Sequence, residues 1–188
     1  MARINGNKIT EGITGMINKQ IVFKERLGTR YASAAPYFNK KKKPTAAQQA
    51  NRDKMKSCNE YATEAIKDPE VKKAYQAAAT GGQTAVNVAF QDAWHAPIVN
   101  DIITNGFKGN AGDIIFVEAT DNFKVNAVKV SIFDRAGILI EEGAAVSRGL
   151  MWMYVVQRNN DDAARIVATA VDLPMNEAVM EVLVSVTW

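Results

Sequence analysis

The hydrophobic pattern of the chain changes near residue 97, and this change constrains the fold more than any other feature of the sequence. Between residues 97 and 188, six apolar stretches, mostly alternating, are separated by turn-forming residues such as Asn159-Asn160-Asp161-Asp162. Alternation with a period of two residues indicates strands that bury one face. Six strands, with a shorter one near residue 98, at intervals of roughly ten to twelve residues are typical of a small antiparallel β-sandwich. We therefore expect a sandwich over residues 97–188.

Residues 44–96 carry helical signals instead. Thr45 and Gln48 have the spacing of a capping box, and Asp68-Pro69 pairs a capping residue with a proline at the first helical position. The third helix should start after Thr84 and end before Pro97, because proline cannot continue a helix. The predicted helices cover about residues 46–66, 69–80 and 85–96. The overall prediction is an α+β protein in three parts, a basic arm over residues 1–43, a helical region over 44–96 and the sandwich over 97–188.

The first part alternates from Ile17 to Arg26, which predicts a half-buried strand of about ten residues. Ile17, Ile21 and Phe23 would share one face of this strand. A turn at Leu27-Gly28 and a second, shorter strand complete a basic β-hairpin. Because an isolated hairpin is only marginally stable in water, we expect it to lie against something else.

The predicted hairpin supplies a candidate assembly interface. Ile17, Ile21 and Phe23 would expose apolar side chains in a lone chain, and the backbone of their strand would expose unpaired hydrogen-bonding groups. Addition of this strand to a sheet edge on a neighbouring copy would satisfy both needs. Arg26 and Arg30 flank the strand and complete the predicted interface.

Charge is distributed unevenly along the chain. Residues 1–80 hold 16 Lys and Arg against 7 Asp and Glu, whereas residues 81–188 hold 7 against 13. The two regions could meet between copies, or the basic region could bind a polyanion. Lys40, Lys41, Lys42 and Lys43 are the candidate polyanion-binding residues, and the competing interpretation is a solvated linker. Tyr31, Tyr37 and Phe38 stand close enough in sequence to stack on bases.

The sequence offers few groups for catalysis. A single cysteine, Cys58, excludes an intramolecular disulfide and any multi-cysteine metal site, and His95 is the only histidine. We expect Cys58 to be a buried, inert thiol and His95 to have a structural role at a helix end. Trp94, Trp152 and Trp188 are expected to pack rather than to bind a ligand, with Trp152 in the sandwich core. We predict no catalytic residue, cofactor or metal site, and hence no enzyme.

Four aspartates fall where predicted strands end, at positions where they could form turns or gather around calcium. They are Asp113, Asp121, Asp134 and Asp172. Their spacing matches no calcium-binding motif, so we expect them to form turns.

Two stretches of the chain resemble known groups of proteins. ATDNFKVNAVKVSIFDRAGILIEEGAA and ATAVDLPMNEA resemble the disulfide-free immunoglobulin-like modules of bacterial surface and phage proteins, over about residues 112–188. GMINKQIVFKERLGTRYASAAP followed by KKPTAAQQANRDKM is similar to uncharacterised bacterial proteins in which a Gly-led basic hairpin precedes a helix. The second similarity depends on Gly15, Val22, Arg26, Gly28, Pro44, Thr45, Gln48 and Arg52. Neither resemblance implies an activity.

Together these features predict a non-enzymatic structural protein that assembles with itself through its N-terminal arm, into a filament, tube, surface layer or phage-like particle. The alternative is an accessory protein that binds nucleic acid through Lys40–Lys43. No stretch approaches the ~20 apolar residues of a membrane-spanning helix, and the N-terminus lacks the apolar core of a secretion signal. We therefore expect a cytoplasmic protein, or one that reaches an extracellular or phage-like assembly by another route.

Overall fold

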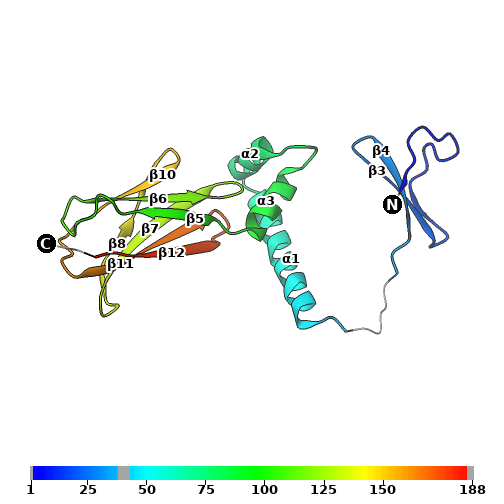
Figure 1. The fold of residues 1–188 in the computed structure, drawn as a ribbon. Coiled ribbons are helices and arrows are strands. Elements are labelled where there is room, and N and C mark those ends of the chain that lie inside the picture. The colour runs from blue at the N-terminus through cyan, green and yellow to red at the C-terminus, as the bar shows by residue number, and fades with distance from the viewer. Residues whose placement is uncertain (1, 38–42, 186–188) are drawn as a thin grey trace. The chain divides into compact units, whose positions relative to one another are not determined.

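The computed structural model describes residues 2–37 and 43–185 (Figure 1). The chain divides into two compact units, residues 1–50 and residues 51–188, and the boundary falls inside the first helix. The described residues form three helices and several antiparallel sheets, so the predicted α+β class is confirmed at this level. None of the described helices is both long enough and apolar enough to cross a membrane.

The first unit contains one four-stranded antiparallel sheet in the order β1-β4-β3-β2. Its strands are β1 (Ala2–Arg3), β2 (Gly15–Ile17), β3 (Ile21–Arg26) and β4 (Thr29–Ala34). β3 and β4 form the predicted hairpin, joined at Leu27-Gly28. Both turn residues have positive φ, 50° for Leu27 and 70° for Gly28. Positive φ at both central positions gives a two-residue turn whose twist matches that of the strands.

The prediction of one continuous strand from Ile17 to Arg26 is wrong. Asn18 and Lys19 have φ angles of 48° and 55°, and the chain reverses at this point so that Ile17 lies opposite Ile21. As a result β3 is hydrogen-bonded to β2 on one side and to β4 on the other. The backbone of this strand is therefore paired on both sides from Ile21 to Phe23, contrary to the prediction that it would be free to join a neighbouring sheet.

The three helices have the predicted bounds to within a few residues. They are α1 (Ala46–Ala65), α2 (Pro69–Ala78) and α3 (Ala85–Trp94). The Thr45–Gln48 capping box is formed, because each residue's backbone N–H donates to the side chain of the other, over 3.0 and 3.3 Å. Asp68 caps α2 by accepting hydrogen bonds from two backbone amides, and Thr84 caps α3. These local contacts determine where the helices begin.

The strands of the second unit form two further antiparallel sheets, in the orders β5-β6-β10-β9 and β12-β11-β7-β8. In chain order they are β5 (Ile98–Ile103), β6 (Ile114–Thr120), β7 (Val125–Asp134), β8 (Leu139–Ala144), β9 (Val146–Arg148), β10 (Met151–Val155), β11 (Ala163–Asp172) and β12 (Glu177–Leu183). Both sheets contribute to a single buried core, with Ile115 and Val117 from one sheet and Val130, Ile132 and Ile166 from the other. The alternating pattern over this region was thus read correctly as strands.

In the second unit the helices lie beside one end of the two sheets (Figure 1). A second core, centred on Ala62, Tyr75 and Ala89, is packed against Phe123 and Leu173 from loops at the ends of strands. The rings of Tyr75 and Phe123 are 4.4 Å apart between centroids. Residues of the helices and of the strand ends therefore meet in one packed region of the second unit.

Candidate functional site

One face of the N-terminal sheet carries a group of apolar side chains, beside the ion pair of Glu25 and Arg30. Because residues directly opposite in an antiparallel pair share a face, Ile17, Ile21 and Phe23 lie on the same face as Ala32 and Ala34 of β4. This set of five residues is called the apolar face below. The predicted interface residues Ile17, Ile21 and Phe23 are therefore brought together, although Ile17 arrives from a separate strand.

The two arginines of the predicted interface are placed differently. Arg30 lies opposite Glu25, and its Nε donates to Glu25 Oε2 over 3.2 Å, so this side chain is engaged within the sheet. Arg26 is exposed and follows Lys24 on the other face. The structure thus places Arg26 away from the apolar side chains that were expected to accompany it.

No residue in the described part of the first unit, residues 2–37 and 43–50, is buried. On the apolar face, Ile17 is 49% exposed and Ile21 is 44% exposed. A four-stranded sheet is normally stabilised by burying one face against other elements. The first unit therefore holds a folded sheet without a core of its own.

The other face of this sheet carries basic side chains at one end and Met16 and Val22 at the other. Arg3, Tyr31 and Lys24 lie opposite one another across β1, β4 and β3, and Arg26 is two residues from Lys24 on the same face. This set of four residues is called the basic face. Lys40, Lys41 and Lys42, predicted to bind polyanions, lie outside the described residues, as does Phe38, whereas Lys43 is described and exposed.

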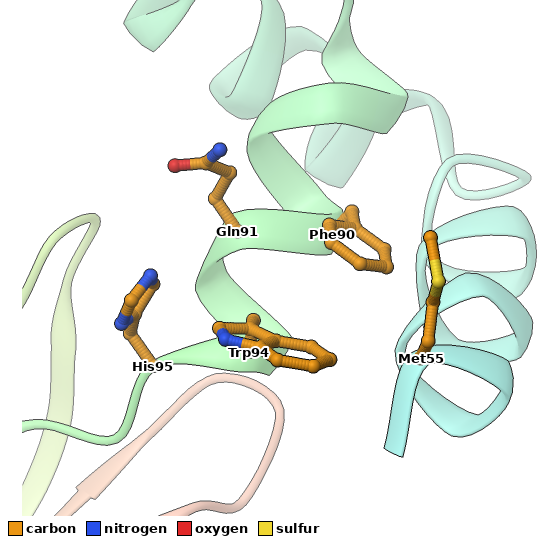
Figure 2. Close-up of a pocket in the computed structure, with 5 residues that line it drawn as sticks. All are labelled: Met55, Phe90, Gln91, Trp94 and His95. Atoms are coloured by element: carbon orange, nitrogen blue, oxygen red, sulfur yellow. The ribbon is translucent and has the colours of Figure 1, made fainter. Parts of the chain in front are cut away.

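A pocket of about 310 Å³ lies between α1 and α3 (Figure 2). Figure 2 shows Met55 of α1 facing the rings of Phe90 and Trp94 of α3, with Gln91 and His95 on another side of α3. The two rings stack with centroids 5.8 Å apart. Lys54 Nζ lies 4.8 Å from the Trp94 ring centroid. This pocket could hold a small apolar group, but it contains no pair of reactive side chains.

The structure bears on several of the remaining single-residue predictions. Cys58 is buried, and burial raises the pKa of its thiol, although Lys54 partly opposes that effect. His95 follows α3 as its C-terminal cap. Trp152 packs against the sandwich core, and Trp188 lies outside the described residues.

All four predicted turn aspartates accept hydrogen bonds from nearby backbone amides. Asp113 accepts from Lys108 and Asn110, Asp121 from Phe123 and Lys124, Asp134 from Ile138, and Asp172 from Asn176. The turn-forming role predicted for them is therefore confirmed. Two of these residues have a second feature in common, because Asp121 and Asp172 lie close to a third aspartate.

Asp92, Asp121 and Asp172 form an acidic cluster. They come from α3, from the loop after β6 and from the end of β11, and each offers an oxygen within 4.8 Å of the other two. Asp92 and Asp172 are fully buried, while Asp121 is partly exposed. Three separate elements thus place three carboxyl groups at one point between the helices and the strand ends.

Neutral donors surround the acidic cluster. The Tyr75 hydroxyl donates to Asp92 Oδ2 over 2.5 Å, and the Tyr61 hydroxyl lies 2.9 Å from that of Tyr75. The Asn176 side-chain amide donates to Asp172 Oδ2 over 2.7 Å and also approaches the carbonyl oxygens of Asp92 and Ala93. Among the described residues, no lysine or arginine forms an ion pair with these carboxylates.

The buried carboxyl groups of the cluster, which pair with no lysine or arginine among the described residues, have raised pKa values. Burial raises the pKa of Asp92 to about 7, and the charges of Asp121 and Asp172 add to this rise while the Tyr75 hydrogen bond opposes it. Burial likewise raises the pKa of Asp172, against the hydrogen bonds from Asn176. The pKa of the Tyr75 hydroxyl is raised well above its ordinary value, first by burial and then by Asp92. Tyr75 therefore remains a hydrogen-bond donor.

Asp92 was not singled out from the sequence, although a signal was present. The buried residues of α3 are Ala85, Val88, Ala89, Asp92 and Ala93. They recur at intervals of three and four, so Asp92 occupies the apolar face of a helix. A carboxylate on such a face is rare unless it is paired or bound to a metal.

Comparisons with known proteins do not identify a family. No family model matches the chain, and no curated protein matches it either. Among solved structures, a hypothetical protein from Pyrococcus horikoshii is 8% identical, with a TM-score of 0.32, covering 48% of this chain and 88% of that one. A conjugative transposon lipoprotein from Bacteroides eggerthii is 13% identical, with a TM-score of 0.27, covering 46% of this chain and 92% of that one.

Proposed function

We propose that this chain is a non-enzymatic structural protein that assembles with copies of itself, and that the apolar face of its N-terminal sheet is the contact surface. The observation that carries this proposal is the lack of any buried residue in the described part of that unit. A surface that covers the side chains of Ile17, Ile21 and Phe23 would stabilise the sheet, because it would remove their apolar area from water. The contact is between faces and does not require the donated strand that the sequence predicted.

The occupant of the apolar face is a second copy of this chain. The first unit, residues 1–50, holds 10 Lys and Arg against 2 Asp and Glu, whereas residues 51–188 hold 13 against 18. Opposite net charges favour contact between the first unit of one copy and the second unit of the next. Because such a contact joins two different surfaces, it repeats head to tail and generates a ring or a filament.

We also propose that residues 98–183 form an immunoglobulin-like module. The orders β5-β6-β10-β9 and β12-β11-β7-β8 correspond to strands A-B-E-D in one sheet and G-F-C-C′ in the other, if β5 is named strand A. Modules of this architecture serve many unrelated functions, so the correspondence supports a scaffold role without naming a ligand.

The experiment is light scattering of the full chain after size-exclusion chromatography over a range of concentrations. The wild-type chain should increase in mass with concentration. Ile21→Asp should remain monomeric, because assembly would bury an unpaired charge on the apolar face. Ser33→Asp is the matched control, since Ser33 lies opposite Val22 on the other face and the substitution changes the charge equally. A wild-type chain that stays monomeric, or two variants that behave alike, would contradict the proposal.

A second candidate function is binding of single-stranded nucleic acid by the basic face. Tyr31 between Arg3 and Lys24 combines an aromatic side chain with cations, which is the arrangement such sites use. Fluorescence anisotropy with a random single strand at physiological salt tests it. Micromolar binding that is lost when Lys24 and Arg26 are changed to serine would favour this function, and the same loss on changing Lys40–Lys43 to serine would extend the site to the lysine run.

A further inference from the structure

The acidic cluster contains buried oxygen atoms that have no hydrogen-bond partner. Asp92 Oδ1 and Asp121 Oδ1 are both inaccessible to solvent and accept no hydrogen bond in the described structure. Asp92 is fully buried as a residue. An unpartnered acceptor of this kind costs about 1–3 kcal/mol, and more when it is charged, so a native structure rarely keeps one without a ligand.

The other oxygens of the cluster are held in place by donors. Asp92 Oδ2 accepts from Tyr75, and Asp121 Oδ2 accepts from the amides of Phe123 and Lys124. Both oxygens of Asp172 accept from Asn176. These bonds fix the orientation of each carboxylate, as the surrounding hydrogen bonds of metal sites do. They leave Asp92 Oδ1 and Asp121 Oδ1 as the free ligand atoms, with a second lone pair on each oxygen of Asp172.

Three carboxylates at one buried point also need positive charge. The surrounding side chains, Tyr61, Tyr75 and Asn176, are neutral, and none of the ion pairs in the described structure reaches the cluster. Ionised carboxylates in such a place are stable only when they are paired or coordinate a metal ion.

We propose that Asp92, Asp121 and Asp172 bind one divalent cation with a preference for oxygen ligands, and that this cation is Ca²⁺. The described groups that converge here are carboxylates, which suit Ca²⁺ and Mg²⁺ rather than zinc or copper. Three separate elements supply the ligands, an arrangement that suits the flexible coordination of Ca²⁺ better than the strict octahedron of Mg²⁺. Asp121 is partly exposed and gives the ion and its waters a path to solvent. This proposal revises the expectation of no metal site.

The bound ion would join the helices to the sandwich. Asp92 belongs to α3, whereas Asp121 and Asp172 belong to the strand ends. Asn176 already connects these regions, because its amide approaches the carbonyl oxygens of Asp92, Ala93 and His95 while it donates to Asp172. An ion at this point would therefore stabilise the second unit as a whole, since a ligand that binds only the folded state raises its stability.

Calorimetry of the full chain after treatment with EDTA tests the proposal, with CaCl₂ and MgCl₂ as separate titrants. We expect saturable binding of one Ca²⁺ per chain, weaker binding of Mg²⁺, and a melting temperature that rises with Ca²⁺. Asp92→Asn should weaken Ca²⁺ binding by about 100-fold or more, because it removes a charged ligand. Asp134→Asn is the matched control, since Asp134 forms a turn outside the cluster and its loss should leave binding unchanged.

Several outcomes would overturn the site. One is the absence of Ca²⁺ uptake at about 1 mM, which is the weakest affinity of extracellular calcium modules. Another is equal Ca²⁺ uptake by Asp92→Asn and the wild type. If Asp92→Asn does not fold, Asp121→Asn decides the matter, because this partly exposed residue is less critical for packing, and unchanged binding there is equally negative. Tighter binding of Mg²⁺ than of Ca²⁺ would overturn the calcium assignment. If the melting temperature changes with pH near 7 but with neither ion, the cluster is stabilised by a proton that the carboxyl groups share, and not by a cation.

Discussion

Glu141 is a buried carboxylate whose surroundings differ from those of the acidic cluster. It is 5% exposed and accepts hydrogen bonds from the Tyr154 hydroxyl over 2.7 Å, from the amides of Gln157 and Arg158 over 2.7 and 3.1 Å, and from Asn160 Nδ2 over 3.0 Å. Burial opposes ionisation, but these four donors outweigh it and lower the pKa of Glu141 below its ordinary value. Because hydrogen bonds satisfy this buried carboxylate, we assign it a role in stabilising the fold.

Glu141 should make the stability of the protein depend on pH. Its pKa is lower in the folded state than in the unfolded state, so the folded state gains stability from the ionised carboxylate above the ordinary value of 4.5 and loses it as the pH falls through the lower folded value. Urea unfolding at pH 7 and near pH 3 measures the effect. Glu141→Gln should cost about 3 kcal/mol at pH 7, because the amide places an N–H₂ group against donors.

The same comparison isolates the contribution of Glu141 from that of other carboxylates. The difference in unfolding free energy between wild type and Glu141→Gln should shrink as the pH falls below 4.5, because the carboxyl group then becomes protonated in the unfolded chain while it stays ionised in the folded one until the lower folded pKa is reached. A difference that stays constant across this range would show that the charge of Glu141 contributes nothing.

At the residue scale, the sequence predicted contacts between neighbouring residues better than contacts between residues that are distant in the sequence. The turn aspartates were predictable because each bonds to a backbone amide only a few residues away, as Asp121 does to Phe123. The meeting of Asp92 with Asp121 and Asp172 joins residues up to 80 positions apart, and no local pattern encodes it. Ile17 and Phe23 were predicted to share a face and do so, but they lie on two paired strands and not on the single strand that the alternation predicted.

At the element scale, Gly143 of β8 determines how the two sheets of the sandwich approach each other. A Cβ at this position would lie 2.7 Å from Tyr154 Cε2 and 2.9 Å from its hydroxyl oxygen. Tyr154 belongs to β10 in the opposite sheet and crosses the core to reach Glu141, which is also on β8. The absence of a side chain at residue 143 therefore permits the hydrogen bond that holds Glu141.

Gly143→Ala should destabilise the protein by about 1–3 kcal/mol, because the added methyl group forces the Tyr154 ring out of its place in a packed core. Ala144→Ser on the same strand is the control, since Ala144 is exposed and exposed substitutions usually change stability by less than about 0.5 kcal/mol. Chemical denaturation of both variants provides the measurement. Equal stability of the two variants would mean that the ring moves aside without cost.

Helices were easier to predict than strands for a physical reason. Helix ends are determined by side chains within three residues of the cap, as at Asp68 and Thr84, and such contacts are visible in the sequence. Strand ends depend on partners that are distant in sequence. The alternation through residues 17–26 continued across a reversal in which Asn18 and Lys19 adopt positive φ, so the pattern alone could not locate the turn.

At the scale of the whole molecule, the two units differ in how they are stabilised. Every buried residue of both cores lies in the second unit, whereas no described residue of the first unit is buried. Charge follows the same division, with a basic first unit and an acidic second unit. The second unit therefore contains the groups that stabilise its own fold, and the apolar side chains described in the first unit stay at least partly exposed.

Removal of residues 1–43 should leave a folded protein that no longer assembles. The truncated chain keeps Pro44, Thr45 and Gln48, so α1 retains its cap, and it loses no residue of either core. We expect circular dichroism to retain the helical signal, thermal unfolding to stay cooperative with a melting temperature within a few degrees of the full chain, and light scattering to give a monomer at concentrations where the full chain assembles. Full-length Ile21→Asp is the control, because it keeps the sheet and removes only the contact. If instead the truncated chain lost helical signal and stability while the full chain stayed monomeric, the sheet would be covering its own helices and the assembly proposal would be abandoned.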